Sequence, residues 1–255
     1  MSQVLALREL LEQRFPGALP LSVGGTAEPV STGVAVLDRL LPQNGLPRAR
    51  LTLWRPGGGA TAVLRESCAR VVARGERAAW IDAAGLVTGS FWKDGPLLVR
   101  PPGVVSALGC AEELLRSGGF ALVVLALGEA SRSASGTHGL EAVRRGAADA
   151  AFVRLSRGAR EGGGALVLVA PHSPVAALRL VSRITSDGYE WDSGPLAEPA
   201  QVAWVRMRVK ATSPGWSGHT EFRLAVAHPD PRLALESALP DRRGVAAVKR
   251  RRWRR

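Results

Sequence analysis

Residues 51–82 read LTLWRPGGGATAVLRESCARVVARGERAAWID, and this stretch decides the fold. The apolar run at 51–54 predicts a strand, and the apolar positions of 61–74 have helical spacing. Glycines lie between these two segments and also follow the helix, and residues 78–82 predict the next strand. A strand, a glycine-rich turn and a helix in this order form the setting in which backbone amides hold a phosphate at a helix N-terminus.

The glycine turn is the candidate nucleotide site, and it is degenerate. A phosphate-binding loop of this kind uses a lysine against the β- and γ-phosphates and a Ser or Thr hydroxyl on Mg²⁺. No lysine lies near this loop, so two interpretations stay open: a plain turn, or a loop whose amides and one hydroxyl still hold an anion. The candidate residues are Gly57, Gly58, Gly59, Ala60 and Thr61.

The alternation of strands and helices continues along the chain. Residues 120–127 (FALVVLAL) are continuously apolar, as in strands that are buried on both faces of a parallel sheet. This rhythm predicts an α/β fold with a mainly parallel central sheet flanked by helices. Further strands are expected at 97–99 and 165–170, and further helices at 104–116 and 139–157.

The pattern changes near residue 200. Residues 201–210 (QVAWVRMRVK) and 221–227 alternate apolar and polar side chains around a Pro-Gly turn, which predicts an antiparallel hairpin at one edge of the sheet. We therefore expect a core over residues 20–235. An amphipathic helix would occupy residues 1–19, either docked on the core or acting as a detachable arm, and a flexible basic tail would occupy 236–255.

Basic residues give the chain a formal net charge of +12 over 255 residues, and the last seven residues supply half of this excess. Such a charge favours a polyanionic partner. Three interpretations of the tail stay open. It could bind DNA, with its cations neutralising phosphates and its tryptophan stacking on a base. It could instead dock in an acidic groove of a protein, or remain solvated. Its residues are Lys249, Arg250, Arg251, Arg252, Trp253, Arg254 and Arg255.

Two further basic residues, Arg206 and Arg208, alternate with apolar residues on the predicted hairpin and share its polar face with Lys210. They would either extend a DNA- or partner-binding surface or form the solvent-exposed face of an edge hairpin. In the second case, their charges would discourage pairing with a strand of another molecule.

Several classes of protein are disfavoured by composition. Two cysteines are too few for a disulfide scaffold or a cysteine-based metal site, so we expect no metal. No apolar run approaches the length of a membrane span, and charged residues near the N-terminus do not suit a signal peptide. We expect a cytoplasmic protein that does not contact a membrane.

The order of short motifs along residues 30–230 resembles the core of the RecA recombinases. Ser31-Thr-Gly33 with Leu37-Asp38, then Gly45-Leu-Pro47, the glycine loop, and Trp80-Ile-Asp82 follow the RecA sequence of motifs. This resemblance implies a RecA-like core of the P-loop NTPase type.

Departures from the RecA pattern fall on the positions that perform catalysis. In that family a lysine of the loop, a glutamate after the second strand and an aspartate at the end of the next buried strand support phosphoryl transfer. Alignment with the RecA motifs places Ala60, Ala84 and Ala126 at these three positions. We therefore expect no ATP hydrolysis, no cofactor and no catalytic residue.

The segment after residue 170 also differs from RecA. His172 stands where RecA has a glutamine that senses the γ-phosphate, or it is simply a polar residue at a strand end. Residues 173–190 do not match the long DNA-binding loop, and Arg179 and Arg183 would either contact phosphates or form the solvated face of a short helix.

A damaged RecA-like core with a short N-terminal helix and a basic tail resembles the ImuA family of bacterial DNA-damage (SOS) mutagenesis cassettes. This resemblance implies a non-catalytic accessory factor in SOS-induced translesion DNA synthesis and DNA repair. Its partners would be RecA, or an ImuB-type inactive Y-family polymerase homologue with an error-prone replicative polymerase, and single-stranded DNA. Alternatives are a SulA-like cell division inhibitor, which shares the degenerate core, and an active RecA-like DNA-dependent ATPase.

Overall fold

The computed structural model describes residues 28–83, 85, 87, 95–127, 145–192 and 201–226. The predicted helix at the N-terminus, the tail over 236–255 and Ala84 lie outside these residues. Within the described part of the chain, no helix is long and apolar enough to cross a membrane.

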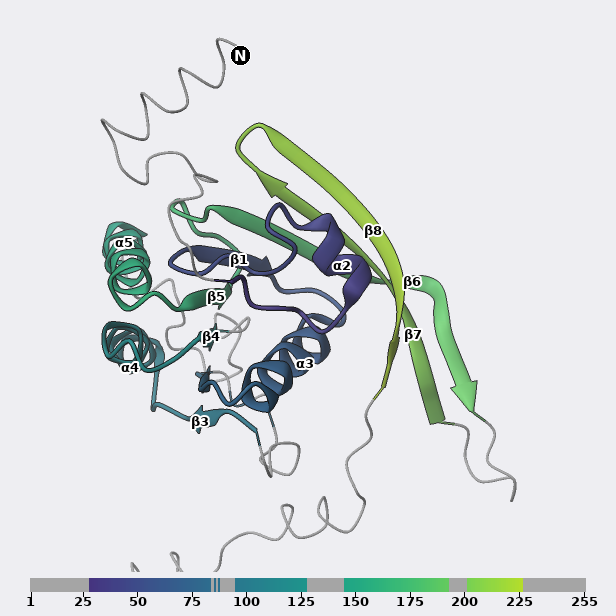
Figure 1. The fold of residues 1–255 in the computed structure, drawn as a ribbon, viewed down its shortest axis with the longest axis horizontal. Helices are drawn as coiled ribbons and strands as arrows, with labels where there is room; N and C mark the ends of the chain where they lie inside the picture. The colour runs from purple at the N-terminus through teal and green to yellow at the C-terminus, as the bar shows by residue number, and fades with distance from the viewer. Residues whose placement is uncertain are drawn as a thin grey trace, which may run out of the picture.

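One mixed sheet of eight strands runs through the fold in the order β3-β2-β4-β5-β1-β6-β7-β8 (Figure 1). The first six strands in this order are parallel, and β7 and β8 continue the sheet as an antiparallel hairpin. This confirms the predicted α/β class with a mainly parallel sheet and an edge hairpin. The strands are β1 (Leu51–Arg55), β2 (Ala78–Asp82), β3 (Leu97–Val99), β4 (Leu122–Ala126), β5 (Ala165–Val169), β6 (Leu178–Asp192), β7 (Gln201–Ser213) and β8 (Trp216–Ala225).

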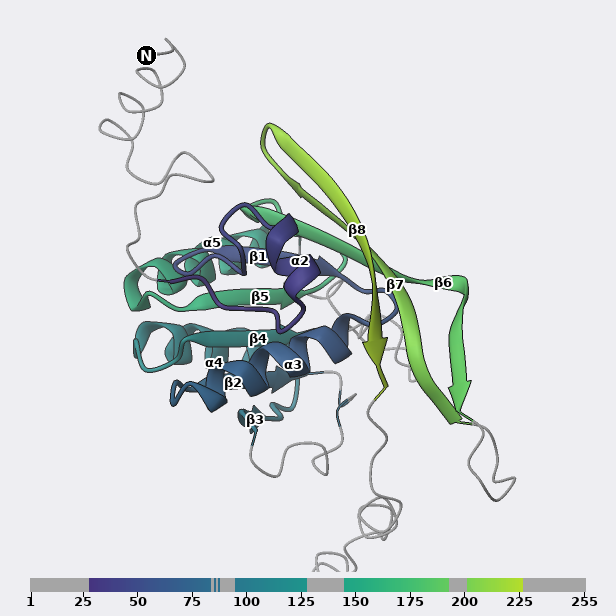
Figure 2. The same cartoon turned by 45° about the vertical axis from the view of Figure 1, so that its right-hand side comes forward.

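Helices cover the parallel half of the sheet on both faces (Figures 1 and 2). Alternate residues of β4 point to opposite faces, so Val124 packs in one apolar cluster with α3 and Leu125 packs in the other with α4 and α5. Both faces of the central strands are therefore buried, which explains their continuous apolar sequence. The helices are α2 (Ala35–Leu40), α3 (Ala60–Ala73), α4 (Val104–Arg116) and α5 (Arg145–Gly162).

Helix α5 ends later than the predicted helix at 139–157, and residues 139–144 of that prediction lie outside the described residues. The helix continues through Gly158 and ends at Gly162, because Gly163 has a positive φ of 72° and begins the turn into β5. Gly162 lies so close to the backbone of Leu115 that no side chain fits there.

The short-helix interpretation of the segment around Arg179 and Arg183 is wrong. Both arginines lie on β6, which runs for 15 residues and pairs with β1 on one side and β7 on the other. The strand changes register between Ile184 and Tyr189, where the intervening residues form a bulge.

The Ser31-Thr-Gly33…Asp38 motif has a structural role. The Asp38 carboxylate accepts hydrogen bonds from the Ser31 hydroxyl at 2.7 Å, the Thr32 backbone N–H at 2.8 Å and the Thr32 hydroxyl at 2.7 Å. The buried Ser67 hydroxyl of α3 lies 3.0 Å from the Val63 carbonyl oxygen of its own helix and 3.3 Å from the Thr32 carbonyl oxygen, so these two acceptors share its one proton. The motif thus holds the residues that precede α2 against α3. This structural role accounts for the motif without a bound ligand.

Candidate functional site

The glycine loop lies at the carboxyl edge of the parallel sheet, between β1 and α3. Ligands of open α/β sheets bind at this edge, so the loop occupies the place where a phosphate would be held. Gly59 is the residue before α3 and has a positive φ of 82°, while Thr61 on the first turn of the helix is exposed.

Each of the three loop glycines faces another part of the protein at close range. A Cβ added to Gly57 would collide with the Ser182 carbonyl oxygen, and one added to Gly58 would lie 2.9 Å from Cγ1 of Ile184. A Cβ on Gly59 would collide with the Met207 side chain. The glycines are therefore required by the close approach of β6 and β7, which favours the plain-turn interpretation of this loop.

Two of the three alanines that the RecA resemblance places at catalytic positions are core residues. Ala60, at the start of α3, is 4% exposed, and Ala126, at the end of β4, is 5% exposed. Both belong to the apolar cluster that also contains Met207. A lysine at position 60 would bury a charge in this cluster, and an aspartate at position 126 would bury a second carboxylate beside Asp82, its register partner on β2, so the alanines fit the packing around them. Ala84, the third position, lies outside the described residues.

Asp82 and His172 are the polar side chains at the ends of β2 and just beyond β5. Asp82 is 2% exposed, and its carboxylate accepts a hydrogen bond of 2.9 Å from the Val87 backbone N–H. It therefore holds the segment that follows β2. His172 is exposed, in accord with a polar residue beyond a strand end.

Arg206 and Arg208 lie on β7 with exposed side chains, as the alternation predicts. Arg208 forms an ion pair with Glu221 of β8, and Arg206 lies 3.9 Å from Glu190 of β6. Residues 249–255, the other predicted contacts to DNA or a partner, lie outside the described residues.

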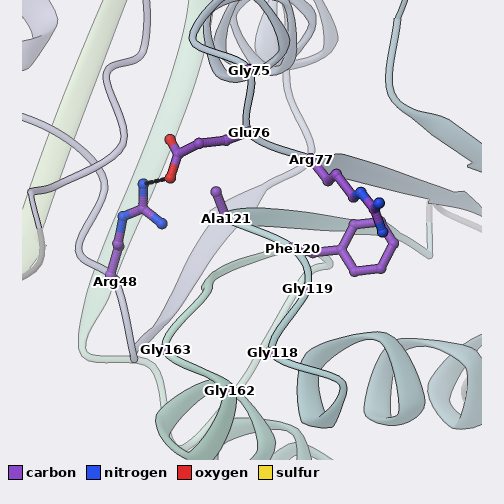
Figure 3. A pocket seen from close by; sticks show the side chains of 10 residues that line it. All are labelled: Arg48, Gly75, Glu76, Arg77, Gly118, Gly119, Phe120, Ala121, Gly162 and Gly163. Atoms are coloured by element: carbon purple, nitrogen blue, oxygen red, sulfur yellow. Dashed lines mark hydrogen bonds and ion pairs between the residues drawn. The ribbon is translucent and has the colours of Figure 1, made fainter.

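A cavity of about 280 Å³ lies at the opposite, amino edge of the sheet (Figure 3). Most of its wall consists of glycine turns that end α3, α4 and α5, and Arg48 and Glu76 form an ion pair of 2.6 Å across it. None of the site residues predicted from the sequence lines this cavity. It is a seam between the helix ends and the strand starts, away from the edge at which α/β sheets bind nucleotides.

Neither cysteine forms a disulfide. Cys68 is buried in α3, and burial raises the pKa of its thiol to about 12, which leaves it protonated and unreactive near neutral pH. The described residues contain no group of three or more His, Cys, Asp or Glu side chains that could hold a metal ion.

The alternation of residues 201–210 placed Arg206, Arg208 and Lys210 on one face of the hairpin, but no local pattern connected them with Arg55 and Arg183. In the structure, Arg55 of β1 and Arg183 of β6 lie on the same face of the sheet as these three cations. Residues 178–180 alternate and are a signal for β6, but Val181 and Ser182 break the alternation.

No protein-family model matches the chain, and no curated protein matches it.

Proposed function

We propose that this protein is a non-catalytic, RecA-like accessory factor of SOS-induced translesion DNA synthesis and DNA repair. It acts by binding RecA, or an ImuB-type polymerase homologue with an error-prone replicative polymerase, and its basic residues contact DNA. The proposal joins the sequence resemblance to the ImuA family with the packing around the glycine loop.

One observation carries the proposal: the loop that would hold a triphosphate is packed against β6 and β7 through all three of its glycines. Phosphoryl transfer depends on charge stabilisation by a lysine and a metal ion around a positioned phosphate. Ala60 and Ala126, at the positions of two such groups, are buried together in the apolar core. The mainly parallel sheet, with its edge hairpin, suits a RecA-like core in which the loop after β1 packs against β6 and β7.

The first test is an ATPase assay of the full chain with single-stranded DNA and Mg²⁺ present. We expect no turnover above a blank that contains no protein. Turnover that is lost in Thr61→Ala would contradict the proposal, because Thr61 carries the exposed hydroxyl at the start of α3. Arg157→Gln, on the exposed face of α5, is a matched control.

The second test is affinity capture of the tagged protein from cells with damaged DNA. We expect enrichment of RecA or of the inactive Y-family polymerase homologue, measured by quantitative mass spectrometry against undamaged cells. Enrichment of a tubulin-like division protein, together with undivided filamentous cells on overexpression, would instead support a SulA-like division inhibitor.

A further inference from the structure

The sheet has one face that the described helices leave uncovered over β6, β7 and β8. Leu178, Leu180 and Ser182 of β6 point to the inner face, where Ser182 accepts a hydrogen bond of 3.0 Å from the Trp54 indole N–H. The intervening residues of β6, including Arg183, therefore point to the opposite side, which we call the outer face. Helix α5 packs on β5 and β1, and α4 packs on β4 and β2, so both leave this part of the sheet open (Figure 2).

Strand register brings many cations together on the outer face. Arg183 lies beside Arg208, and Val181 lies between Arg55 on β1 and Lys210 on β7. On the hairpin, Arg206 lies beside Arg223. The charged residues of the outer face are Arg55, Arg179, Arg183, Arg206, Arg208, Lys210, Arg223, Glu190 and Glu221.

The two glutamates neutralise only one end of this surface. Glu221 pairs with Arg208, and Glu190 pairs with Arg223 and lies 3.9 Å from Arg206. Arg55, Arg183 and Lys210 are exposed, and none of them forms an ion pair with another described residue. Three cations on three neighbouring strands therefore remain available to an anion.

The chemistry of the surface favours nucleic acid over a protein partner. Protein interfaces are depleted of charge at their centre, whereas nucleic-acid interfaces are polar and strongly positive. Here the centre of the face carries Arg55, Arg183 and Lys210, the cations without an ion-pair partner among the described residues. At the glutamate end, the Trp204 ring is 42% exposed and the Arg223 guanidinium lies 5.1 Å from its centroid. Exposed aromatic rings beside a basic track are the means by which proteins bind unpaired bases.

We propose that the outer face of β6, β7 and β8 binds single-stranded nucleic acid. Arg55, Arg183 and Lys210 hold successive phosphates by charge, and Trp204, with the Arg223 guanidinium over its ring, forms a stack that a base extends. This inference deepens the proposed function and rests on it for its biological role, because a translesion factor acts where DNA is unpaired. Binding of nucleic acid to this face does not depend on that biological role and is tested separately.

The experiment measures binding of a fluorescent oligothymidylate to the full-length protein by anisotropy over a range of salt concentrations. The test variant is Arg183→Gln with Lys210→Gln, and the matched control is Arg157→Gln with Arg160→Gln on the exposed side of α5. Both double variants remove two positive charges and leave residues 249–255 intact. A thermal unfolding scan checks that each variant is folded.

Each phosphate contact to a single strand contributes about 0.7 to the slope of log K against log salt. We therefore expect the test variant to bind more weakly than the wild type at low salt, with a slope reduced by about 1.4, twice the contribution of one contact. The control should keep both the affinity and the slope. Trp204→Ala should lower affinity without changing the slope, because stacking releases no counterions.

Equal losses in the test variant and the control would overturn the proposal, because binding would then follow net charge alone. Unchanged oligothymidylate binding, with loss of affinity for an acidic polyglutamate peptide, would overturn it in favour of an acidic protein partner. Either result would leave the ATPase and affinity-capture tests of the accessory role untouched, so the two proposals fail independently.

Discussion

Met207 of β7 packs against the backbone of Gly59, at a point where any side chain on residue 59 would collide with it. Met207 is fully buried, and Gly59 has a positive φ of 82° at the start of α3. The hairpin at one edge of the sheet thus fixes the conformation of the loop after β1. Residues about 150 positions apart in the chain decide the shape of the candidate phosphate site.

Gly59→Ala should destabilise the protein through both backbone strain and collision with Met207. Gly215→Ala is the matched control, since Gly215 has a similar φ of 75° with no atom within 4 Å of an added Cβ. We expect Gly59→Ala to lower the free energy of unfolding by about 1–3 kcal/mol more than the control, the usual cost of overpacking. Denaturant titration measures both values, and equal losses would show that Met207 yields without cost.

Ala126→Asp should bury a charge beside Asp82 of β2, at the position that the RecA resemblance assigns to a metal-binding aspartate. An uncompensated charge in this cluster should cost about 3–5 kcal/mol at pH 7. Burial raises the pKa of the introduced carboxyl, so the penalty should shrink as pH falls toward the range in which the unfolded chain is also protonated. Ala126→Asn carries no titrating group, and its cost should stay constant with pH. A penalty for the aspartate that does not depend on pH would contradict this account.

Asp38→Ala removes the acceptor for three hydrogen bonds that tie Ser31 and Thr32 to α2. Hydrogen bonds to a charged group stabilise more than neutral ones, so we expect a loss of about 2–3 kcal/mol in chemical denaturation. Asp187→Ala, at an exposed position on β6, should change stability by less than about 0.5 kcal/mol. If Asp38→Ala were as mild as this control, the motif would not be the structural tie that its geometry indicates.

Cys68 should make stability fall as the solution becomes alkaline. Its thiol has a pKa raised to about 12 by burial, above its value in the unfolded chain. Between the two values the unfolded state releases a proton that the folded state keeps. The free energy of unfolding should therefore be unaffected near neutrality and then decrease by up to about 1.4 kcal/mol per pH unit above about pH 9.

Cys68→Ala should flatten this part of the stability curve, measured by urea titration between neutral and alkaline pH. In native protein, Cys68 should resist alkylation, whereas the partly exposed Cys110 should react first. Peptide mapping by mass spectrometry distinguishes the two sites. Rapid labelling of Cys68 in folded protein would show that α3 opens far more readily than its packing indicates.

Much of the fold could be predicted because its signals are local. The apolar run that contains Val124 and Leu125 identified a buried parallel strand, and the alternation of residues 201–210 identified the edge hairpin. Strand β6 was missed because its alternation breaks twice: Val181 is exposed and Ser182 is buried, and residues 185–188 then form a bulge. Such an irregularity forms through pairing with β7, which is a contact distant in sequence.

The candidate site could be predicted only in part. The sequence located the glycines and the alanines at positions 60 and 126, but it left the loop open to two interpretations. The packing of the loop glycines favours the plain-turn interpretation, because the neighbours of the loop are Ser182, Ile184 and Met207. No local pattern around Gly57 to Gly59 contains these contacts.

By itself, the sequence determined the class of the fold, the alternation of its elements and the residue types available at the loop, since propensity and periodicity act over a few residues. Tertiary structure alone decided that β6 and β7 pack against this loop and that Arg55, Arg183 and Lys210 share one face that the described helices leave uncovered. The reason is physical: strand register brings together side chains from distant parts of the chain, and close packing then determines which space remains for a ligand.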